Sequence, residues 1–176
     1  MRAATAGRPF GPGVFFAFGG GFAIVQAVTV PDPFPDPVLL FDGECGLCNR
    51  VVRGLLRIDR GQRLRFAALQ GDPAQSFLRE RGLPTHDFDT LVLVTNWKER
   101  TSCRYLLRTD GVIASLRACG GFGRILAAGL ALIPAPWRDA VYRLVGHTRY
   151  RWFGPWRPCP LAKPEWGARF LDAPRP

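Results

Sequence analysis

Two cysteines three positions apart, Cys45 and Cys48, are the residues of this 176-residue chain best suited to carry chemistry. They follow an apolar run and an acidic turn in the stretch "LLFDGECGLC". Three interpretations are open: a redox pair, half of a metal site, or two inert thiols. Side chains three positions apart on a helix lie on one face, one turn apart, which brings two sulfurs within reach of a disulfide.

The position of Cys45 favours the redox interpretation. The sequence predicts a buried strand at 38–41 and an amphipathic helix at 46–58, so Cys45 stands at the start of that helix. Unpaired backbone N–H groups and the positive end of the helix dipole stabilise a thiolate there. We therefore expect Cys45 to attack a substrate disulfide, and Cys48, which we expect to be the more buried thiol, to resolve the mixed disulfide.

Three neighbours of the pair are candidate site residues. Gly43 and Gly46 flank Cys45, and we expect them to keep the approach to its thiol open. We expect Asp42 either to cap the turn or to move a proton to or from Cys48.

Zinc is the main rival to redox chemistry. A structural zinc ion usually takes four ligands, often as two close pairs. The chain has no second CxxC, and the residues that could complete a site are distant in sequence: Cys103, Cys119, Cys159 and His147. We therefore expect neither a metal nor a cofactor. Cys103 and Cys119 are expected to be buried structural thiols, and Cys159, between two prolines, is a candidate third redox thiol.

The predicted elements give the chain its fold class. A strand–helix–strand unit predicts a parallel pair with a right-handed crossover, and two strands with a short link predict an antiparallel hairpin. The pattern thus predicts an α/β fold of thioredoxin-like type, with a mixed central sheet of about four strands, flanking helices and extra C-terminal helices. Strands are expected at 38–41, 64–69, 90–95 and 104–108, and helices at 46–58, from Asp72 to Gly82, from a Thr109 or Asp110 cap, at 122–133 and from Trp137.

The composition divides the chain into three parts. Residues 1–37 are apolar and Gly-rich and end in "PDPFPDP"; we expect a disordered leader and linker there, with a weak signal or membrane anchor and an ordered extension as alternatives. The domain is placed at 38–161, with a tail at 162–176. Five widely spaced cysteines are unlike a secreted disulfide framework. We expect a cytoplasmic location, the alternative being membrane association or export through the N-terminal segment.

The formal net charge of +10 raises the question of an anionic partner. No run of basic residues exceeds two, so we expect a solvated surface rather than specific nucleic-acid binding. The expected partners are thiols and disulfides of proteins or small molecules, and an anionic membrane surface is a further candidate. The rival function is a basic membrane-peripheral or partner-binding module whose CxxC is structural or binds zinc. The sequence does not predict an oligomeric state.

The segment "HTRYRWFGPWRPC" mixes arginines with aromatic residues near the end of the last helix. We expect Trp152 and Phe153 to anchor it to the sheet while the arginines stay solvated. Gly154 and Pro155 end the helix, so the chain can turn back over the redox side and bring Cys159 toward Cys45.

The motif "LLFDGECGLC" resembles the Asp-Gly-x-Cys-x-x-Cys opening of the DCC family of thiol-disulfide oxidoreductases. The resemblance continues through "LRFAALQ", "LVLV", "RTDGVIASL", "LIPAPWRDAVYRLVGHTRYRWFG" and the cysteine of "RPCPL". It implies a thioredoxin-like fold and a bacterial origin, and it makes Asp42, Cys45 and Cys48 the motif residues, with residues 150–154 and Cys159 in a C-terminal signature. One departure from thioredoxin concerns the cis-proline that precedes its third strand, because Thr90 stands in that place here.

Overall fold

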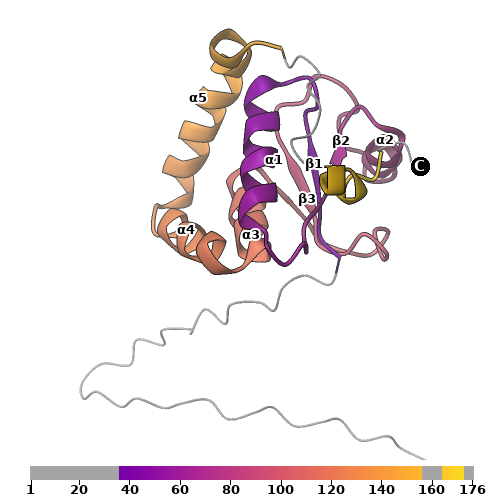
Figure 1. Cartoon of the computed structure of the whole chain (residues 1–176). Helices are drawn as coiled ribbons and strands as arrows, with labels where there is room; N and C mark the ends of the chain where they lie inside the picture. The colour runs from indigo at the N-terminus through magenta and orange to yellow at the C-terminus, as the bar shows by residue number, and fades with distance from the viewer. Residues whose placement is uncertain (1–35, 156–163, 173–176) are drawn as a thin grey trace, which may run out of the picture. The chain divides into compact units, whose positions relative to one another are not determined.

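A single mixed sheet with the strand order β2–β1–β3–β4 forms the centre of the fold (Figure 1). The structure, a computed structural model, describes residues 36–155 and 164–172. The pairs β1–β3 and β3–β4 are antiparallel and the pair β1–β2 is parallel. The predicted parallel pair, antiparallel hairpin and α/β fold class are therefore confirmed. The strands are β1 (Val38–Phe41), β2 (Arg65–Ala68), β3 (Val92–Val94) and β4 (Tyr105–Leu107).

The inner strand β1 is covered on both faces. Leu39 and Phe41 belong to a core shared with α1 and α3, whereas Val38 and Leu40 belong to a second core shared with α2. A continuous apolar run is typical of a strand that is buried on both sides. The stretch "VLLF" therefore predicted the place of this strand correctly.

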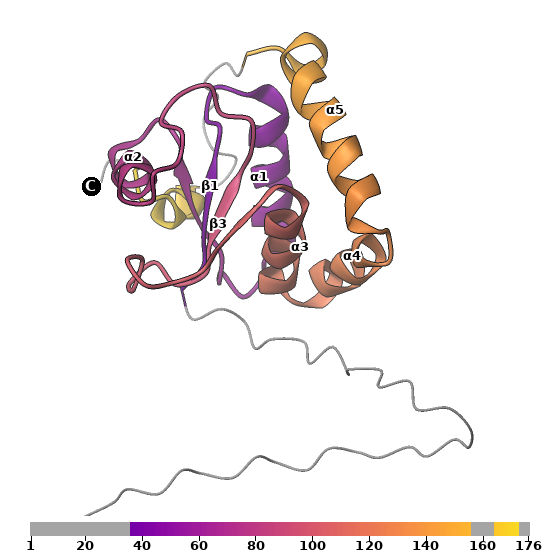
Figure 2. The same cartoon turned by 180° about the vertical axis from the view of Figure 1, so that it is seen from behind.

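Helices cover the two faces of the sheet unequally. α1 and α3 lie on one face and α2 on the other, and α5 packs against α1 and α3 (Figures 1 and 2). Within residues 36–155 and 164–172, no helix is both long and apolar enough to cross a membrane. The helices are α1 (Gly46–Ile58), α2 (Asp72–Glu80), α3 (Arg108–Cys119), α4 (Gly121–Ala131), α5 (Ala135–Phe153) and the 3-10 helix η1 (Pro164–Arg169).

Every predicted helix is present, but the start of α3 differs from the prediction. The helix begins at Arg108 with no side-chain cap, instead of at a Thr109 or Asp110 cap. The Thr109 hydroxyl donates a hydrogen bond to the carboxylate of Asp139 on α5 instead. A tertiary contact thus replaces the local cap that the sequence indicated.

The helix α5 directs polar residues toward the start of β3 and leaves several of its large apolar residues exposed. Val141, Leu144 and Trp152, which share one side of the helix, are exposed. The inner side contains Tyr142, whose hydroxyl accepts a hydrogen bond from the backbone N–H of Leu91 at 3.1 Å. These polar contacts at the start of β3 fix the orientation of the helix and leave its large apolar side chains outside.

Residues 164–172 pack on the domain, although the sequence placed them in a tail outside it. Trp166 is buried in the core on the α1 side, and the ring of Phe170 lies 5.5 Å from that of Phe66 on β2. The buried Arg169 donates to the carbonyl of Leu64 at 3.0 Å. These side chains cover β2, which is an edge strand and needs such cover.

Candidate active site

The two cysteines of the motif lie at the start of α1, as predicted. Cys45 is the N-cap residue of the helix and Cys48 lies in its first turn. Both thiols are free, and Cys45 lies near enough to Cys48 to help raise its pKa. The local pattern of buried strand, turn and amphipathic helix therefore brings the two sulfurs together.

The relative burial of the two thiols is the reverse of the prediction. Cys45 is 0% exposed, whereas Cys48 is partly exposed. The chain that leaves α5 causes this burial, because the backbone of Pro155 pairs with that of Cys45. The N–H of Gly46 also donates to the carbonyl of Gly154 at 3.2 Å. The prediction that Cys48 would be the more buried thiol is wrong.

The two glycines of the motif allow close packing rather than an open approach. A Cβ atom on Gly46 would lie 2.6 Å from the carbonyl oxygen of Phe153. A Cβ atom on Gly43 would lie 3.1 Å from the Cβ atom of Ala68 and 3.2 Å from Oε1 of Gln70. Gly46 therefore lets the end of α5 approach the motif closely instead of opening the approach to Cys45, whereas the predicted role of Gly43 stays a prediction.

The end of α5 reaches the motif by a different route from the one predicted. Trp152 is 67% exposed, so its predicted anchoring role is wrong. Phe153 is half-buried, with the guanidinium of Arg50 lying 5.3 Å from the centre of its ring. The prediction that the chain closes over the redox side is confirmed, but Gly154 and Pro155 make the contact.

Asp42 is buried and holds four hydrogen-bond donors. Its Oδ1 accepts from the N–H of Glu44 at 3.1 Å and from Nε2 of Gln70 at 2.8 Å. Its Oδ2 accepts from Nη2 of Arg149 at 3.1 Å and from the hydroxyl of Tyr150. The bond to Glu44 closes an Asx turn, which confirms the turn-capping role. The proton-transfer role stays a prediction.

Arg149 is a site residue that the sequence analysis missed, because it left the arginines of this segment in solvent. The side chain is buried and also donates to the carbonyl oxygen of Phe88. Its Nε is buried without a hydrogen-bond partner in the structure. The signal that could have placed Arg149 inside is its helical spacing from Tyr142, seven residues earlier, on the inner side of α5.

The surroundings of the pair raise the pKa values of Cys48, Arg149 and Tyr150. Burial, the neighbouring Cys45 and Asp42 raise the pKa of Cys48 to about 12, and Arg149 opposes this rise only in part. Burial works against the charged form of Arg149, but Cys48, Cys45 and Asp42 outweigh it and raise the pKa of the guanidinium. Burial and the hydrogen bond to Asp42 raise the pKa of Tyr150 as well. Cys48 thus stays protonated at neutral pH beside a permanent cation.

An apolar hollow of about 210 Å³ lies beside Cys48, between α1 and α5. Arg149 supplies the only charged side chain among the residues that line it. Apolar side chains from β1, α1, α3 and α5 make up most of the wall: Leu39, Phe41, Leu47, Val51, Val112 and Val145.

The remaining candidates form contacts of their own or lie outside the described residues. Thr90 precedes β3, and its hydroxyl accepts from the N–H of Arg108 at 2.9 Å and lies 3.4 Å from the hydroxyl of Tyr142, so it links the strand to α5. Cys119 is buried in the core, where burial raises its pKa to about 12. Cys103 is partly buried against the core on the α2 side. Cys159 lies outside the described residues.

Comparisons with known proteins match this arrangement to one family. The model of the family described as "DCC1-like thiol-disulfide oxidoreductase" matches residues 39–155. The "Uncharacterized protein YuxK" of Bacillus subtilis (strain 168) is 35% identical over 140 residues, which cover 80% of this chain and 97% of that protein. The "DCC family protein At1g52590, chloroplastic" of Arabidopsis thaliana is 32% identical over 125 residues, 71% of this chain and 69% of that protein. No solved structure matches. The chain therefore belongs to the DCC1-like family of thiol-disulfide oxidoreductases.

Proposed function

We propose that this protein carries out thiol–disulfide exchange, with Cys45 as the attacking thiolate and Cys48 as the resolving thiol. The observation that carries the proposal is the proximity of two free thiols at the start of α1, beside the buried cation of Arg149. The name of the family supports the reaction class. The roles of the individual residues rest on the following physical arguments.

Two sources of positive potential act on a sulfur anion at Cys45. Cys45 begins α1; the N–H of Gly46 donates to the carbonyl of Gly154, but no side chain caps the other N–H groups of the first turn, so the positive end of the helix dipole acts at this position. The charge of Arg149 interacts with Cys45 as well as with Cys48. Cys48 has a pKa of about 12, so it stays protonated at neutral pH and does not compete with Cys45 as the attacking thiolate.

The reaction then proceeds in two balanced steps. The Cys45 thiolate attacks one sulfur of a substrate disulfide, forms a mixed disulfide and releases the other sulfur as a thiolate that takes up a proton. This step removes the negative charge of Cys45, which is one cause of the raised pKa of Cys48. Cys48 then loses its proton more easily and attacks the sulfur of Cys45. The second substrate thiol leaves, and the pair is left as a disulfide.

Asp42 acts in this scheme mainly by holding Arg149 in place. Its carboxylate accepts four hydrogen bonds, two of them from Arg149 and Tyr150. A carboxylate offers about four lone-pair sites, so little acceptor capacity remains for a thiol proton. We therefore infer that Asp42 positions the cation rather than transferring the proton.

Substrate access requires the chain at Pro155 to move away from Cys45. The bridge between Pro155 and Cys45 occupies backbone groups that an extended substrate would use. The apolar hollow beside Cys48 then suits an apolar side chain next to the substrate disulfide. We infer a preference for disulfides flanked by apolar groups.

A trapping experiment with oxidised glutathione tests the proposal. We expect the Cys48→Ser protein to keep one glutathione on Cys45, as measured by mass spectrometry of the intact protein and its peptides. The wild-type protein should release glutathione and form the Cys45–Cys48 disulfide, and Cys45→Ser should form no adduct at the motif. Cys103→Ser is the matched control and should behave like the wild type. A glutathione adduct on Cys48 in the Cys45→Ser protein, with none on Cys45 in Cys48→Ser, would reverse the roles.

A further inference from the structure

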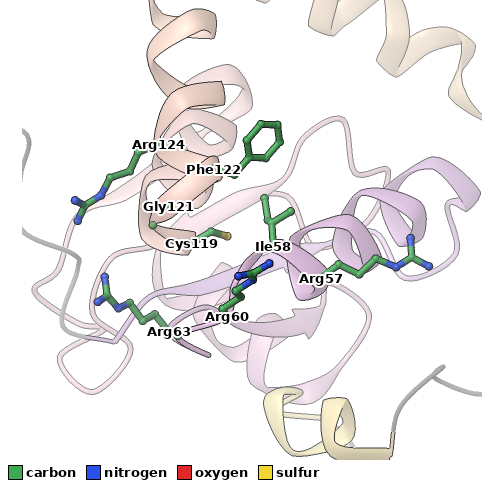
Figure 3. A pocket seen from close by; sticks show the side chains of 10 residues that line it. Arg57, Ile58, Arg60, Arg63, Cys119, Gly121, Phe122 and Arg124 are labelled. Carbon is green, nitrogen blue, oxygen red and sulfur yellow. The ribbon is translucent and has the colours of Figure 1, made fainter.

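Four arginines surround a hollow of about 640 Å³ at the ends of α1 and α3 and the start of α4 (Figure 3). Arg57 and Arg60 come from the end of α1 and the residues just after it, Arg63 follows, and Arg124 lies in the first turn of α4. All four side chains belong to exposed residues. None of them forms an ion pair with a carboxylate of residues 36–155 or 164–172. Unpaired like charges that line one hollow attract an anion.

The helix α4 beside this arginine cluster is packed the opposite way from an ordinary surface helix. Its buried residues, Gly123 and Ala127, are small and lie against α3, where a Cβ atom on Gly123 would be 2.4 Å from the carbonyl oxygen of Leu116. Surface helices normally turn their large apolar residues toward the core. Here Phe122 and Ile125 are 60% and 67% exposed.

The exposed apolar side chains continue from α4 around the corner into α5. They recur at helical spacing on the side of α4 away from Gly123 and Ala127 and then follow the turn, where Leu132 is 85% exposed. We call this set the outer stripe; its members are Phe122, Ile125, Leu126, Leu132, Ile133 and Trp137. Phe122 also lines the hollow of the arginine cluster, so the two features meet (Figure 3).

We propose that the arginine cluster and the outer stripe together dock the protein on the surface of an anionic phospholipid membrane. The guanidinium groups would bind lipid phosphates, for which their geometry is suited. The outer stripe would enter the boundary between headgroups and acyl chains, with Trp137 at the depth where tryptophan is enriched. A surface that combines cationic side chains with exposed apolar ones is typical of binding in the plane of the membrane, without crossing it.

Two other occupants fit this surface less well. A nucleic acid would satisfy the arginines and could stack a base on Trp137, but it offers little to the exposed aliphatic side chains of Ile125 and Leu132. A second copy of the chain would cover the outer stripe, but a two-fold interface places the same patch on both sides. It would bring two arginine clusters toward each other without carboxylates to pair them.

Vesicle co-sedimentation of the full chain tests the proposal. We expect binding to vesicles of equal parts phosphatidylcholine and phosphatidylglycerol, little binding to phosphatidylcholine alone, and weaker binding as salt rises. The double variant Arg60→Gln, Arg124→Gln should bind the anionic vesicles more weakly by a factor on the order of ten. Ile125→Gln with Leu132→Gln should also weaken binding. The matched control, Arg79→Gln with Arg104→Gln, removes two exposed arginines elsewhere and should bind like the wild type.

Several outcomes would overturn the proposal. These are equal binding to neutral vesicles, an equal loss in the Arg79 and Arg104 control, or unchanged binding in both variants of the docking surface. Binding of a single-stranded oligonucleotide that depends on Arg60 and Arg124, without vesicle binding, would assign the surface to nucleic acid. A dimer in light scattering that Ile125→Gln abolishes, again without vesicle binding, would assign it to a second copy. Glutathione exchange by all variants should match the wild type, which separates this test from that of the proposed reaction.

Discussion

The backbone of Pro155 forms an antiparallel bridge with that of Cys45, so the chain that leaves α5 lies directly on the buried thiol. The hydrogen bond from Gly46 to the carbonyl of Gly154 holds the same two segments together. The match to the family model ends at residue 155, so its last residue lies against the first cysteine of the motif. The motif and the end of the matched region therefore form one site.

Gly46→Ala should loosen the cover of Cys45. The added Cβ atom would lie 2.6 Å from the carbonyl oxygen of Phe153, so the segment after α5 must shift. We expect alkylation of Cys45 by iodoacetamide to become faster, and the free energy of unfolding to fall by about 1–3 kcal/mol. Peptide mass spectrometry and urea unfolding measure the two effects.

Gly54→Ala is the matched control for this variant. Gly54 lies in the same helix, and a Cβ atom there would meet nothing within 4 Å. Alkylation of Cys45 should stay unchanged, and the helix should gain up to about 1 kcal/mol of stability. Equal alkylation rates in Gly46→Ala and the wild type would mean that Pro155 does not limit access to Cys45.

Removing the cation of Arg149 should slow the reaction. In Arg149→Met, Cys45 and Cys48 lose a neighbouring positive charge, and we expect mixed-disulfide formation with oxidised glutathione at pH 7 to slow by roughly tenfold. Arg149→Lys keeps the charge and should recover most of the rate. Leaving Asp42 buried without its cation should also cost about 3–5 kcal/mol of stability.

The variant Tyr150→Phe separates the effect of the Arg149 charge on the exchange rate from the effect of the hydrogen bonds around Asp42. It removes the hydroxyl that donates to Asp42 but keeps Arg149 charged. Its exchange rate should stay within a factor of about three of the wild type. A tenfold loss in Tyr150→Phe with none in Arg149→Met would move the electrostatic role from the arginine to the tyrosine.

The stability of the reduced protein should fall in alkaline solution. Cys48 and Cys119 have pKa values of about 12 in the fold, against an ordinary value of 9.0. Above about pH 9 the unfolded chain loses these protons while the folded protein keeps them, so unfolding becomes more favourable up to about pH 12. Each thiol should contribute at most about 1.4 kcal/mol per pH unit.

Urea unfolding in the presence of a reductant measures this pH dependence. Cys119→Ala removes one of the two titrating thiols, so its stability should fall less steeply between about pH 9 and pH 12. Cys103→Ala is the control and should keep the slope of the wild type. A Cys119→Ala protein with the full slope would show that this thiol does not cause the loss.

A chain that ends at residue 163 should be much less stable than the full chain. Asp59 is buried and would lose its ion pair with Arg169, and the core would lose Trp166. Removing one partner of a buried ion pair costs about 3–5 kcal/mol. Thermal and urea unfolding measure the loss, and Arg169→Met should reproduce much of it. For comparison, a chain that begins at Asp36 should keep the free energy of unfolding of the full chain. If it lost as much stability as the chain that ends at residue 163, residues 1–35 would contribute to stability as much as residues 164–176 do.

Local sequence patterns predicted the helices, the strands and the location of the redox pair. The continuous run at β1, the alternation of strands and helices, and the motif at the start of α1 all depend on local patterns of two to four residues. These patterns were sufficient for the mixed sheet, the five helices and the proximity of Cys45 and Cys48. The family resemblance at the motif was likewise visible in the order of residues.

The groups that surround that pair come from distant segments that the fold brings together. The burial of Cys45 beneath Pro155 and the contact of Arg149 with Asp42 join residues more than a hundred positions apart. An arginine on a helix has the same local sequence pattern whether its side chain faces solvent or a buried carboxylate. Helical spacing predicts on which side of the helix the arginine lies, but not which residues of other segments face that side. Gly46 shows the same limit: its sequence position suggested open space, and the approaching backbone of Phe153 made it a site of close packing.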